Sequence, residues 1–184
     1  MNDTKQRLAR LRTIEGHIRG VARMVEADAY CIDSMKQTHA IARALDKFNS
    51  VVLEHHLAHC VTAAIRSEDE HERERVVGEL VHVFAPPTTE AESDMPLARH
   101  AQLQAIEAAV RNVAQLVERD AYCIEIIREA QAVKQSLAAF STGILADHLN
   151  GCVTTAIRGD AAAERERKMR ELLTVFNATN QLSA

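Results

Sequence analysis

The sequence predicts an all-α protein, and three observations support this fold class. Ala, Leu, Val and Ile must build the core, because there is no Trp and aromatic residues make up only 3% of the chain. Apolar residues recur at helical spacing, and no stretch shows the strict alternation that is typical of a strand. The chain also contains one helical unit written twice, 92 residues apart, so we expect two tandem three-helix repeats.

The two repeats align residues 7–84 with residues 99–176 without a gap, and 35 of the 78 aligned pairs are identical. The motif DAYCI, for example, occurs at 28–32 and again at 120–124. Between the copies, the segment APPTTEAESD holds two of the three prolines and no apolar periodicity, which is typical of a linker. We therefore predict a first repeat over residues 1–84, a linker over 85–95 and a second repeat over 96–184.

The first repeat is expected to contain three helices. The second of them covers about 29–66 with Asp28 as its N-cap, since neither Gly nor Pro interrupts this stretch. The third begins near Ser67, whose S-x-x-E spacing with Glu70 resembles a capping box, and ends near Phe84. The first covers about 4–26, where six apolar residues recur at helical spacing: Leu8, Leu11, Ile14, Ile18, Val21 and Val25.

Histidine and cysteine occur together near the end of each long helix. Residues 55–60 read HHLAHC, and the matching residues 147–152 read DHLNGC. Spacing of i, i+4 places a histidine and a cysteine on the same face of a helix. The residues that recur in both segments are His56, Leu57 and Cys60 in the first repeat and His148, Leu149 and Cys152 in the second.

The length of the second helix decides which cysteines can share a metal ion. Cys31 precedes His56 by 25 residues, a distance of roughly 37 Å along an unbroken helix. Metal–ligand bonds measure about 2.0–2.3 Å, so Cys31 cannot share an ion with the histidine and cysteine of its own repeat. An antiparallel partner helix would bring the required residues together. The sequence therefore predicts two metal sites, Cys31 with His148 and Cys152, and Cys123 with His56 and Cys60.

Two sulfurs and one nitrogen suit Cu(I), which accepts trigonal coordination by thiolates. The alternative is Zn(II), which prefers four ligands. His55, His59 or Asp147 could supply a fourth ligand, and the two sites would then differ. We expect His55 and His59 to be solvated helix residues instead, because the second repeat does without them. A lone cysteine is often a small apolar core residue, but four cysteines at matching positions favour metal sites.

Other features of the sequence restrict the class of function. The charged start MNDTKQRLARLR lacks the apolar segment of a secretory signal, and no apolar run approaches the roughly 18 residues of a membrane span. We therefore expect a cytoplasmic protein with reduced cysteines and no membrane contact. We expect no enzyme, because there is neither a glycine-rich phosphate loop nor a Ser/His/Asp arrangement. The net charge of −4 argues against indiscriminate nucleic-acid binding but allows a local basic patch.

Three motifs, RLARLRTIEGHIRG at 7–20, DAYCID at 28–33 and HLAHCV at 56–61, resemble those of the CsoR/RcnR/FrmR-type metal-sensitive transcriptional repressors. The match covers nearly all of the first repeat and, more loosely, the second. The resemblance implies a three-helix protomer, an antiparallel four-helix dimer core and a disc-like dimer of dimers. Members usually carry one repeat, so this chain resembles a covalently linked, antiparallel helical-bundle pseudo-dimer. A homodimer of tandem chains would then form a pseudo-tetramer.

The Cys–His–Cys set without a further N-terminal histidine ligand resembles the copper-sensing CsoR-like subgroup. Asn2, in place of a proline, departs from the formaldehyde-responsive members. His56 and His148 depart from the persulfide sensors, which dispense with this histidine. Similar proteins place a tyrosine and a glutamate around the metal ligands, and the matching residues are Tyr30, Tyr122, Glu79 and Glu171.

The resemblance also implies that basic residues on the first two helices of a repeat contact operator DNA. Residues 1–66 carry 10 Lys and Arg against 7 Asp and Glu, whereas residues 93–158 carry 6 against 7. The second repeat has therefore lost possible phosphate contacts. The alternative is that these cations only solvate a helix face. The candidate DNA-binding residues are Arg7, Arg10, Arg12, Arg19, Arg43 and Lys47.

These observations together predict a cytoplasmic Cu(I)-responsive transcriptional repressor that releases operator DNA when it binds metal. The alternative is a copper-binding or copper-buffering protein of the same fold that has lost specific DNA binding, because its second repeat is poor in cations.

Overall fold

The structure is a computed structural model that describes residues 2–84 and 98–180. Over these two ranges the chain is helical and contains no strand, which confirms the all-α prediction. The predicted linker, residues 85–95, lies outside the described residues. No helix in the described ranges combines the length and the apolar character that crossing a membrane would require.

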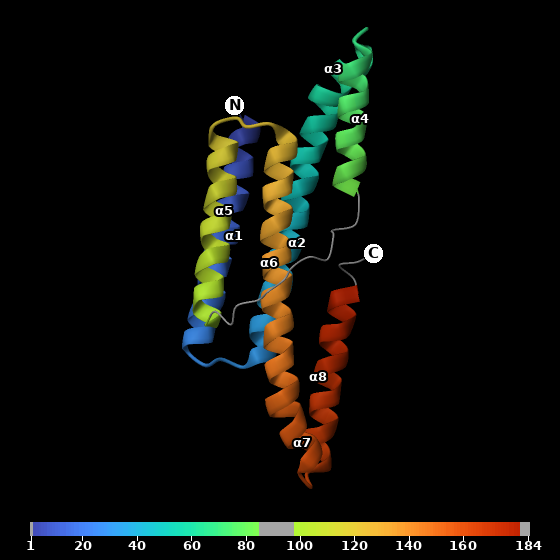
Figure 1. The fold of residues 1–184 in the computed structure, drawn as a ribbon. Helices are drawn as coiled ribbons and strands as arrows, with labels where there is room; N and C mark the ends of the chain where they lie inside the picture. Colours follow the sequence, from blue (N-terminus) through green and yellow to red (C-terminus); the bar gives the residue numbers. More distant parts are fainter. Residues whose placement is uncertain (1, 85–97, 181–184) are drawn as a thin grey trace.

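Each repeat contributes a first helix, a long second helix with a π-helical turn, and a third helix that folds back along it (Figure 1). In the first repeat these are α1 (Asn2–Glu26), α2 (Cys31–His56), the π-helical turn η1 (Leu57–Val61), α3 (Thr62–Arg66) and α4 (Glu70–Phe84). In the second they are α5 (Arg99–Glu118), α6 (Cys123–His148), the π-helical turn η2 (Leu149–Val153), α7 (Thr154–Arg158) and α8 (Ala162–Asn180).

The second helix of the first repeat is one continuous rod from Cys31 to Arg66, as the distance argument requires. Its backbone stays in the right-handed helical region through η1, with φ −62° and ψ −45° at Leu57 and φ −61° and ψ −40° at Thr62. The Thr62 hydroxyl donates a hydrogen bond of 2.8 Å to the carbonyl of Leu57. The wider π-helical turn was not predicted from the sequence, and such turns are frequent at functional sites.

Asp28 is not the N-cap of the second helix, so that prediction is wrong. Its φ of 50° places it in the left-handed region at the end of α1, where Asp is tolerated better than most residues. The amide of Asp28 donates to the carbonyl of Val25, and the amide of Ala29 donates to that of Met24. This pattern is a Schellman motif. Helix α2 begins three residues later, at Cys31.

The predicted capping box of Ser67 and Glu70 is also absent, because Asp69 caps α4 instead. One carboxylate oxygen of Asp69 accepts hydrogen bonds from the amides of His71, at 3.0 Å, and Glu72, at 3.3 Å. The Ser67 hydroxyl accepts one from the amide of Asp69 at 3.1 Å. In the second repeat the residue that matches Asp69 is Ala161, which offers no side-chain cap.

Replacing Asp69 with alanine is expected to destabilise the protein by about 1 kcal/mol, because two amide donors at the start of α4 lose their acceptor. The free energy of unfolding from urea titrations, followed by circular dichroism, measures this loss. The exposed neighbour Glu68 provides the control, since Glu68→Ala removes a charge without removing the cap. Equal effects of the two substitutions would contradict the role of Asp69.

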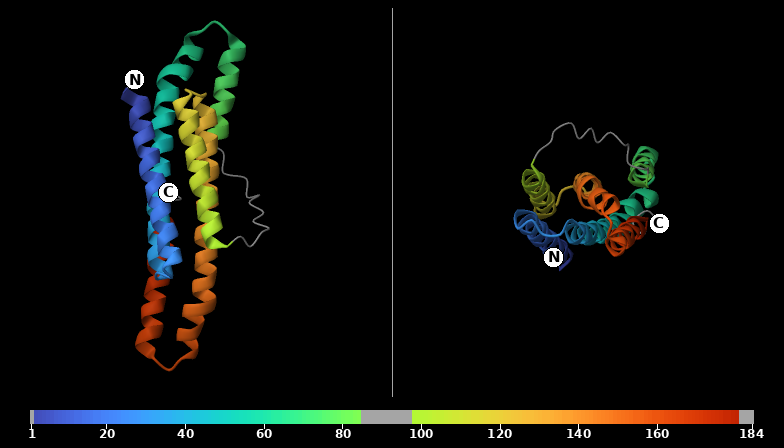
Figure 2. Two further views of the ribbon diagram at one scale, coloured as in Figure 1. Left: turned by 90° about the vertical axis from the view of Figure 1, so that its left-hand side faces the viewer. Right: turned by 90° about the horizontal axis from the view of Figure 1, so that it is seen from below.

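The core lies between four helices, α1, α2, α5 and α6, which form an elongated bundle (Figure 2). Helix α2 runs antiparallel to α6: Thr38 hydrogen-bonds Ser141 at 2.8 Å, and eight residues further along α2 Asp46 pairs with Lys134 at 2.5 Å. Helix α1 runs antiparallel to α5 in the same way, because Glu15 pairs with Arg111 while Glu26, further along α1, lies 3.1 Å from His100 near the start of α5. Large fully buried core side chains from both repeats include Leu11, Ile14, Ile18, Leu45, Phe48, Leu103, Ile127 and Leu137.

Helices α4 and α8 lie outside this bundle and project toward opposite ends of the molecule (Figure 1). Helix α4 packs against α6, and α8 packs against α2. The third helix of each repeat therefore contacts the long helix of the other repeat. This arrangement confirms two tandem three-helix repeats in an antiparallel bundle, and it places the start of each long helix beside the end of the other.

Candidate metal centres

Two clusters of histidine and cysteine occur at opposite ends of the α2–α6 pair. One, which we call the Cys31 site, consists of Cys31, His148 and Cys152. The other, the Cys123 site, consists of His56, Cys60 and Cys123. Within each cluster the three potential ligand atoms all lie within 4.8 Å of one another. The structure thus brings together the two sets of three residues that the sequence analysis singled out.

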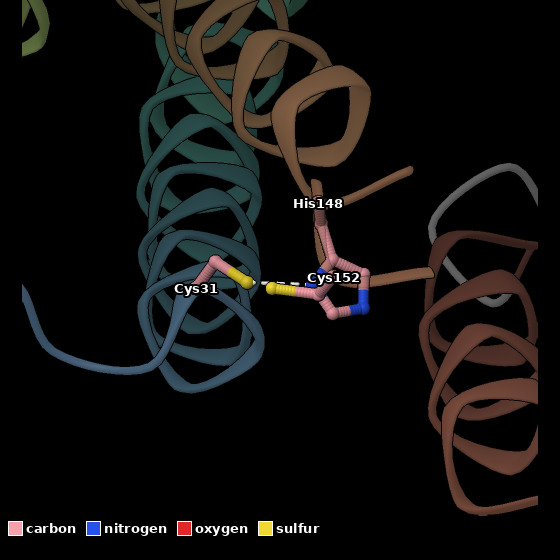
Figure 3. Close-up of side chains that lie close together, drawn as sticks. All are labelled: Cys31, His148 and Cys152. Atoms are coloured by element: carbon pink, nitrogen blue, oxygen red, sulfur yellow. Dashed lines mark hydrogen bonds between the residues drawn. The ribbon is translucent and has the colours of Figure 1, made fainter. Parts of the chain in front are cut away.

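The Cys31 site forms where the first residue of α2 meets the last residue of α6 (Figure 3). The sulfur of Cys31 lies 2.7 Å from Nδ1 of His148, and Cys152 approaches from η2. The site opens into a cleft of about 370 Å³ that Tyr30 and Arg99 also line. Because Cys152 is exposed, an ion can reach the sulfurs from solvent without a change in the fold.

The burial of His56 indicates that the Cys123 site suits a metal ion. Its side chain is fully buried, yet neither ring nitrogen has a hydrogen-bond partner among the described residues. A buried polar atom without a partner costs about 1–3 kcal/mol. A metal ion satisfies such an atom, and two thiols beside an imidazole are donors that Cu(I) prefers. The residues present therefore fit a soft metal ion.

Burial also favours the neutral forms of the thiols and the imidazole in the metal-free sites. It raises the pKa of the Cys31 thiol, to which the neighbouring Cys152 adds, and it raises the pKa of Cys123, to which Cys60 adds. Burial lowers the pKa of His148 below its ordinary value. At neutral pH these groups are therefore neutral. Binding of a metal cation must displace protons from the thiols, which couples metal affinity to pH.

The tyrosines and glutamates that the family resemblance implied lie beside the two clusters. Each tyrosine pairs with the glutamate of the other repeat. Tyr30 donates a hydrogen bond to Glu171, and Tyr122 donates one to Glu79 at 2.6 Å. Each tyrosine ring meets the site histidine edge-on. Ring centroids are 5.9 Å apart for Tyr30 and His148 and 5.6 Å apart for the other pair. The third helix thus supplies a carboxylate to the start of the opposite long helix.

A cation completes each tyrosine–glutamate pair, and the sequence analysis missed both. At the Cys31 site, Lys168 is only 5% exposed; its ammonium contacts the Tyr30 hydroxyl and lies 3.4 Å from Glu171. At the Cys123 site, Arg75 lies 3.2 Å from the Tyr122 hydroxyl. Val76 occupies the position that matches Lys168. The sequence feature that could have indicated Lys168 is the difference between the two repeats: a lysine stands where the first repeat has a valine, three residues before Glu171.

His55 is not the solvated residue that the sequence analysis expected. It is half-buried, and its Nδ1 lies 3.5 Å from the sulfur of Cys123. His59 is exposed and packs its ring against that of His55, with centroids 4.4 Å apart. Asp147, which matches His55, instead pairs with Arg99 and remains exposed.

The candidate DNA-binding residues do not form one uniform group. The side chains of Arg12, Arg19, Arg43 and Lys47 are exposed. Arg7 is only 4% exposed and pairs with Asp3 at 3.3 Å, so it is not available to a phosphate, and we remove it from the candidate DNA-binding residues. Arg10 is partly buried, with its Nε out of reach of solvent.

Comparison with known proteins adds an independent observation. Residues 3–85 and 98–178 each match the family described as metal-sensitive transcriptional repressor. The copper-sensing transcriptional repressor CsoR of Mycobacterium tuberculosis (strain H37Rv) is 47% identical over 58 residues, which is 32% of this chain and 49% of the relative. The copper-sensing repressor RicR of the same organism is 50% identical over 56 residues, 30% of this chain and 58% of the relative.

CsoR of Bacillus subtilis (strain 168) is 43% identical over 75 residues, 41% of this chain and 71% of the relative. The chain spans about half the length of the mycobacterial CsoR proteins that it matches. No solved structure was found to match. Because the family match covers both repeats, and both carry the same cross-repeat cluster of cysteine and histidine, this chain belongs to the metal-sensitive transcriptional repressor family as a tandem duplication.

Proposed function

We propose that this chain is a Cu(I)-responsive transcriptional repressor that binds operator DNA in its metal-free form and releases it when copper binds. The observation that carries this proposal is the convergence of two thiols and one buried imidazole, from opposite repeats, at each end of the α2–α6 pair. The names of the similar proteins, copper-sensing repressors from Mycobacterium and Bacillus, support the choice of metal.

The residues of each proposed site have distinct tasks. Cys31 and Cys152 would hold copper from two different repeats, and His148 would supply the nitrogen donor between them. Copper, when bound, supplies strong bonds to soft sulfur ligands and thereby links the repeats. The Tyr30–Glu171 hydrogen bond is expected to hold α8 against the start of α2 and to orient the imidazole ring.

The exposed arginines of the first repeat form the proposed DNA contact. Arg12 and Arg19 lie on α1, and Arg43 and Lys47 lie on α2, so all four belong to the bundle whose two ends carry the metal sites. Metal binding across the α2–α6 pair therefore acts on the helices that carry these cations. Coupling of this kind is reciprocal: DNA must weaken the affinity for Cu(I) by the same factor by which Cu(I) weakens the affinity for DNA.

Two tandem chains are proposed to associate as a homodimer that resembles a tetramer of single repeats. Large apolar side chains remain exposed on the third helices, among them Val77 and Val81 on α4 and Met169 and Leu173 on α8. Burial of these side chains against a second copy would remove apolar surface from water. Sedimentation equilibrium measures the state directly; a single 20.4 kDa species would contradict the homodimer.

The central experiment is an anisotropy titration of the full chain against DNA from its own promoter region, with and without Cu(I), under anaerobic conditions. The proposal expects specific binding by the metal-free protein and a lower affinity after copper is added. Coupling free energies of this kind typically correspond to a change of roughly 5-fold to 150-fold. Binding that does not respond to copper would contradict the proposal.

Removing two of the cations of α2, Arg43 and Lys47, is expected to weaken DNA binding and its dependence on salt. Arg43→Gln and Lys47→Ala copy Gln135 and Ala139 of the second repeat. If each cation contacts one phosphate, the slope of log K against log salt becomes shallower by about 1.8 for the double variant. The control is Arg170→Gln, which removes an exposed cation from α8 and should leave the slope unchanged. An unchanged slope in the double variant would exclude these two residues.

The second candidate function is a copper-binding or copper-buffering protein that no longer recognises an operator. The loss of cations in the second repeat favours it, because residues 93–158 carry fewer basic than acidic residues. The same titration separates the two functions. Absence of specific DNA binding with and without Cu(I), in a protein that still binds copper, would establish the buffer in place of the repressor.

A further inference from the structure

The two metal clusters differ in the residue that precedes the site histidine. At the Cys123 site this residue is His55, whose Nδ1 lies 3.5 Å from the sulfur of Cys123. At the Cys31 site it is Asp147, whose side chain is 70% exposed, pairs with Arg99 and is not among the donors that lie within 4.8 Å of one another. The first site therefore has a fourth donor in contact with one of its three ligands, although His55 lies outside the group of donors that are all within 4.8 Å of one another. Its ring must turn further toward His56 and Cys60 for one ion to bind all four.

A carboxylate lies beside the ring of His55. Asp3 lies 3.8 Å from Nε2 of this histidine and is itself held by Arg7 at 3.3 Å. With Nε2 directed at the carboxylate, Nδ1 faces the thiol of Cys123. In metal-bound histidines a carboxylate hydrogen-bonded to the outer nitrogen fixes the ring, and Asp3 lies on the corresponding side of His55 at ion-pair distance. The residue that matches Asp3 in the second repeat is Met95, which cannot take this role.

The distance between His55 and Cys123 agrees with joint binding of one ion. With Zn–S bonds of about 2.3 Å and Zn–N bonds of about 2.0 Å, a sulfur and a nitrogen on one tetrahedral ion are about 3.5 Å apart. The observed separation is 3.5 Å. His56 and Cys60 supply the other two donors, and neither ring nitrogen of His56 has a hydrogen-bond partner among the described residues.

We infer that His55 is the fourth ligand of the Cys123 site, and that this site holds a four-coordinate divalent ion such as Zn(II) more tightly than the Cys31 site does. The Cys31 site remains a set of two sulfurs and one nitrogen, which suits Cu(I) but leaves Zn(II) short of one protein ligand. The inference rests on the proposed function only in taking the Cys123 cluster as a metal site. It makes the two sites of one chain unequal.

Competition titrations of the full chain with a chromophoric chelator test this inference. With Zn(II) alone, wild-type protein is expected to bind one ion at least roughly tenfold more tightly than the second. His55→Ala should weaken that tight site by at least roughly 10-fold, because loss of a mere hydrogen-bonding partner of a metal ligand already costs about 10-fold to 100-fold in affinity. The matched control, Asp147→Ala, should leave it unchanged. Two equal Zn(II) sites in the wild type, or a tight site that survives loss of His55, would overturn the inference.

Two further measurements separate the loss of a ligand from unfolding of the variant and from a failure of the proposed copper binding. Co(II) in place of Zn(II) should give the intense visible absorption of a tetrahedral ion, and His55→Asp, which copies the second repeat, should remove it. The same variants are titrated with Cu(I). If Cu(I) still binds at both clusters, and the affinity for Zn(II) does not change when His55 is replaced, then His55 is not a ligand and the proposed function stands. If Cu(I) does not bind but Zn(II) binding depends on His55, the proposed function fails and the inference stands.

Discussion

Replacing Cys31 with alanine is expected to lower tight Cu(I) binding from two ions per chain to one. The variant leaves His148 and Cys152 as two donors without a partner from α2, while the Cys123 cluster keeps all three of its residues. The number of bound ions is measured under anaerobic conditions by competition with a chromophoric Cu(I) chelator. Cys123→Ala is the matched control and should remove the other ion.

Double variants determine whether the sites form between the repeats. Cys31→Ala with His148→Ala removes two donors from one cluster, so one Cu(I) ion should still bind. Cys31→Ala with His56→Ala damages both clusters, so neither tight ion should remain. The opposite pattern would show that each cysteine shares an ion with the histidine of its own repeat, and it would contradict the arrangement of α2 and α6.

Replacing Phe48 with alanine is expected to cost about 3–5 kcal/mol of folding stability, because a large buried side chain is lost and a cavity remains. Phe48 lies on α2 within the four-helix core, and its side chain is fully buried. Guanidinium or urea unfolding followed by circular dichroism gives the change in free energy. Ile65→Ala is the control, because this side chain is 60% exposed and its loss should change stability by less than about 0.5 kcal/mol.

Copper should oppose the loss of stability caused by Phe48→Ala. Both clusters need α2 and α6 side by side, so Cu(I) binds the folded chain and stabilises it according to its concentration. At a free concentration 100 times the dissociation constant, each site adds about 2.7 kcal/mol. If the variant loses less than about 1 kcal/mol, or if copper does not raise its unfolding midpoint, the core does not hold the sites as described.

The pairing of the repeats could be predicted because it follows from the length of the second helix of each repeat. A continuous helix keeps Cys31 far from His56 whatever its side chains do, and only an antiparallel neighbour brings a second histidine within reach. The structure has this neighbour, with α2 continuous through a π-helical turn. The internal repeat supplied the partner, since both copies carry the same three residue types at the same positions.

The errors concern local contacts that a sequence pattern does not determine. Asp28 is a good N-cap residue, but Asp is also tolerated in the left-handed conformation, and here it ends α1. Ser67 and Glu70 had the spacing of a capping box, yet Asp69 lies closer to the first amides of α4. In both places two alternative caps compete for the same few residues. Their energies are similar, so the residue types alone do not decide which cap forms.

Tertiary contacts account for the remaining differences. Arg7 looked like a surface cation, but the fold buries it beside Asp3. Lys168 was not predicted as a site residue from the sequence, but it occupies the position of the buried Val76 and contacts Tyr30 from the other repeat. Such pairs depend on how α8 meets α2, which no feature within one repeat reveals.

The duplication within one polypeptide has a consequence for how the protein can diversify. In an assembly of identical single-repeat subunits, every substitution occurs at all symmetry-related places at once. Here the matching positions 55 and 147 hold His and Asp, and the matching positions 76 and 168 hold Val and Lys, so a substitution in one repeat does not require the same substitution in the other. One repeat can therefore retain its arginines while the other loses them. The two metal sites can likewise differ in the metal that they bind most tightly, although both belong to one folded chain.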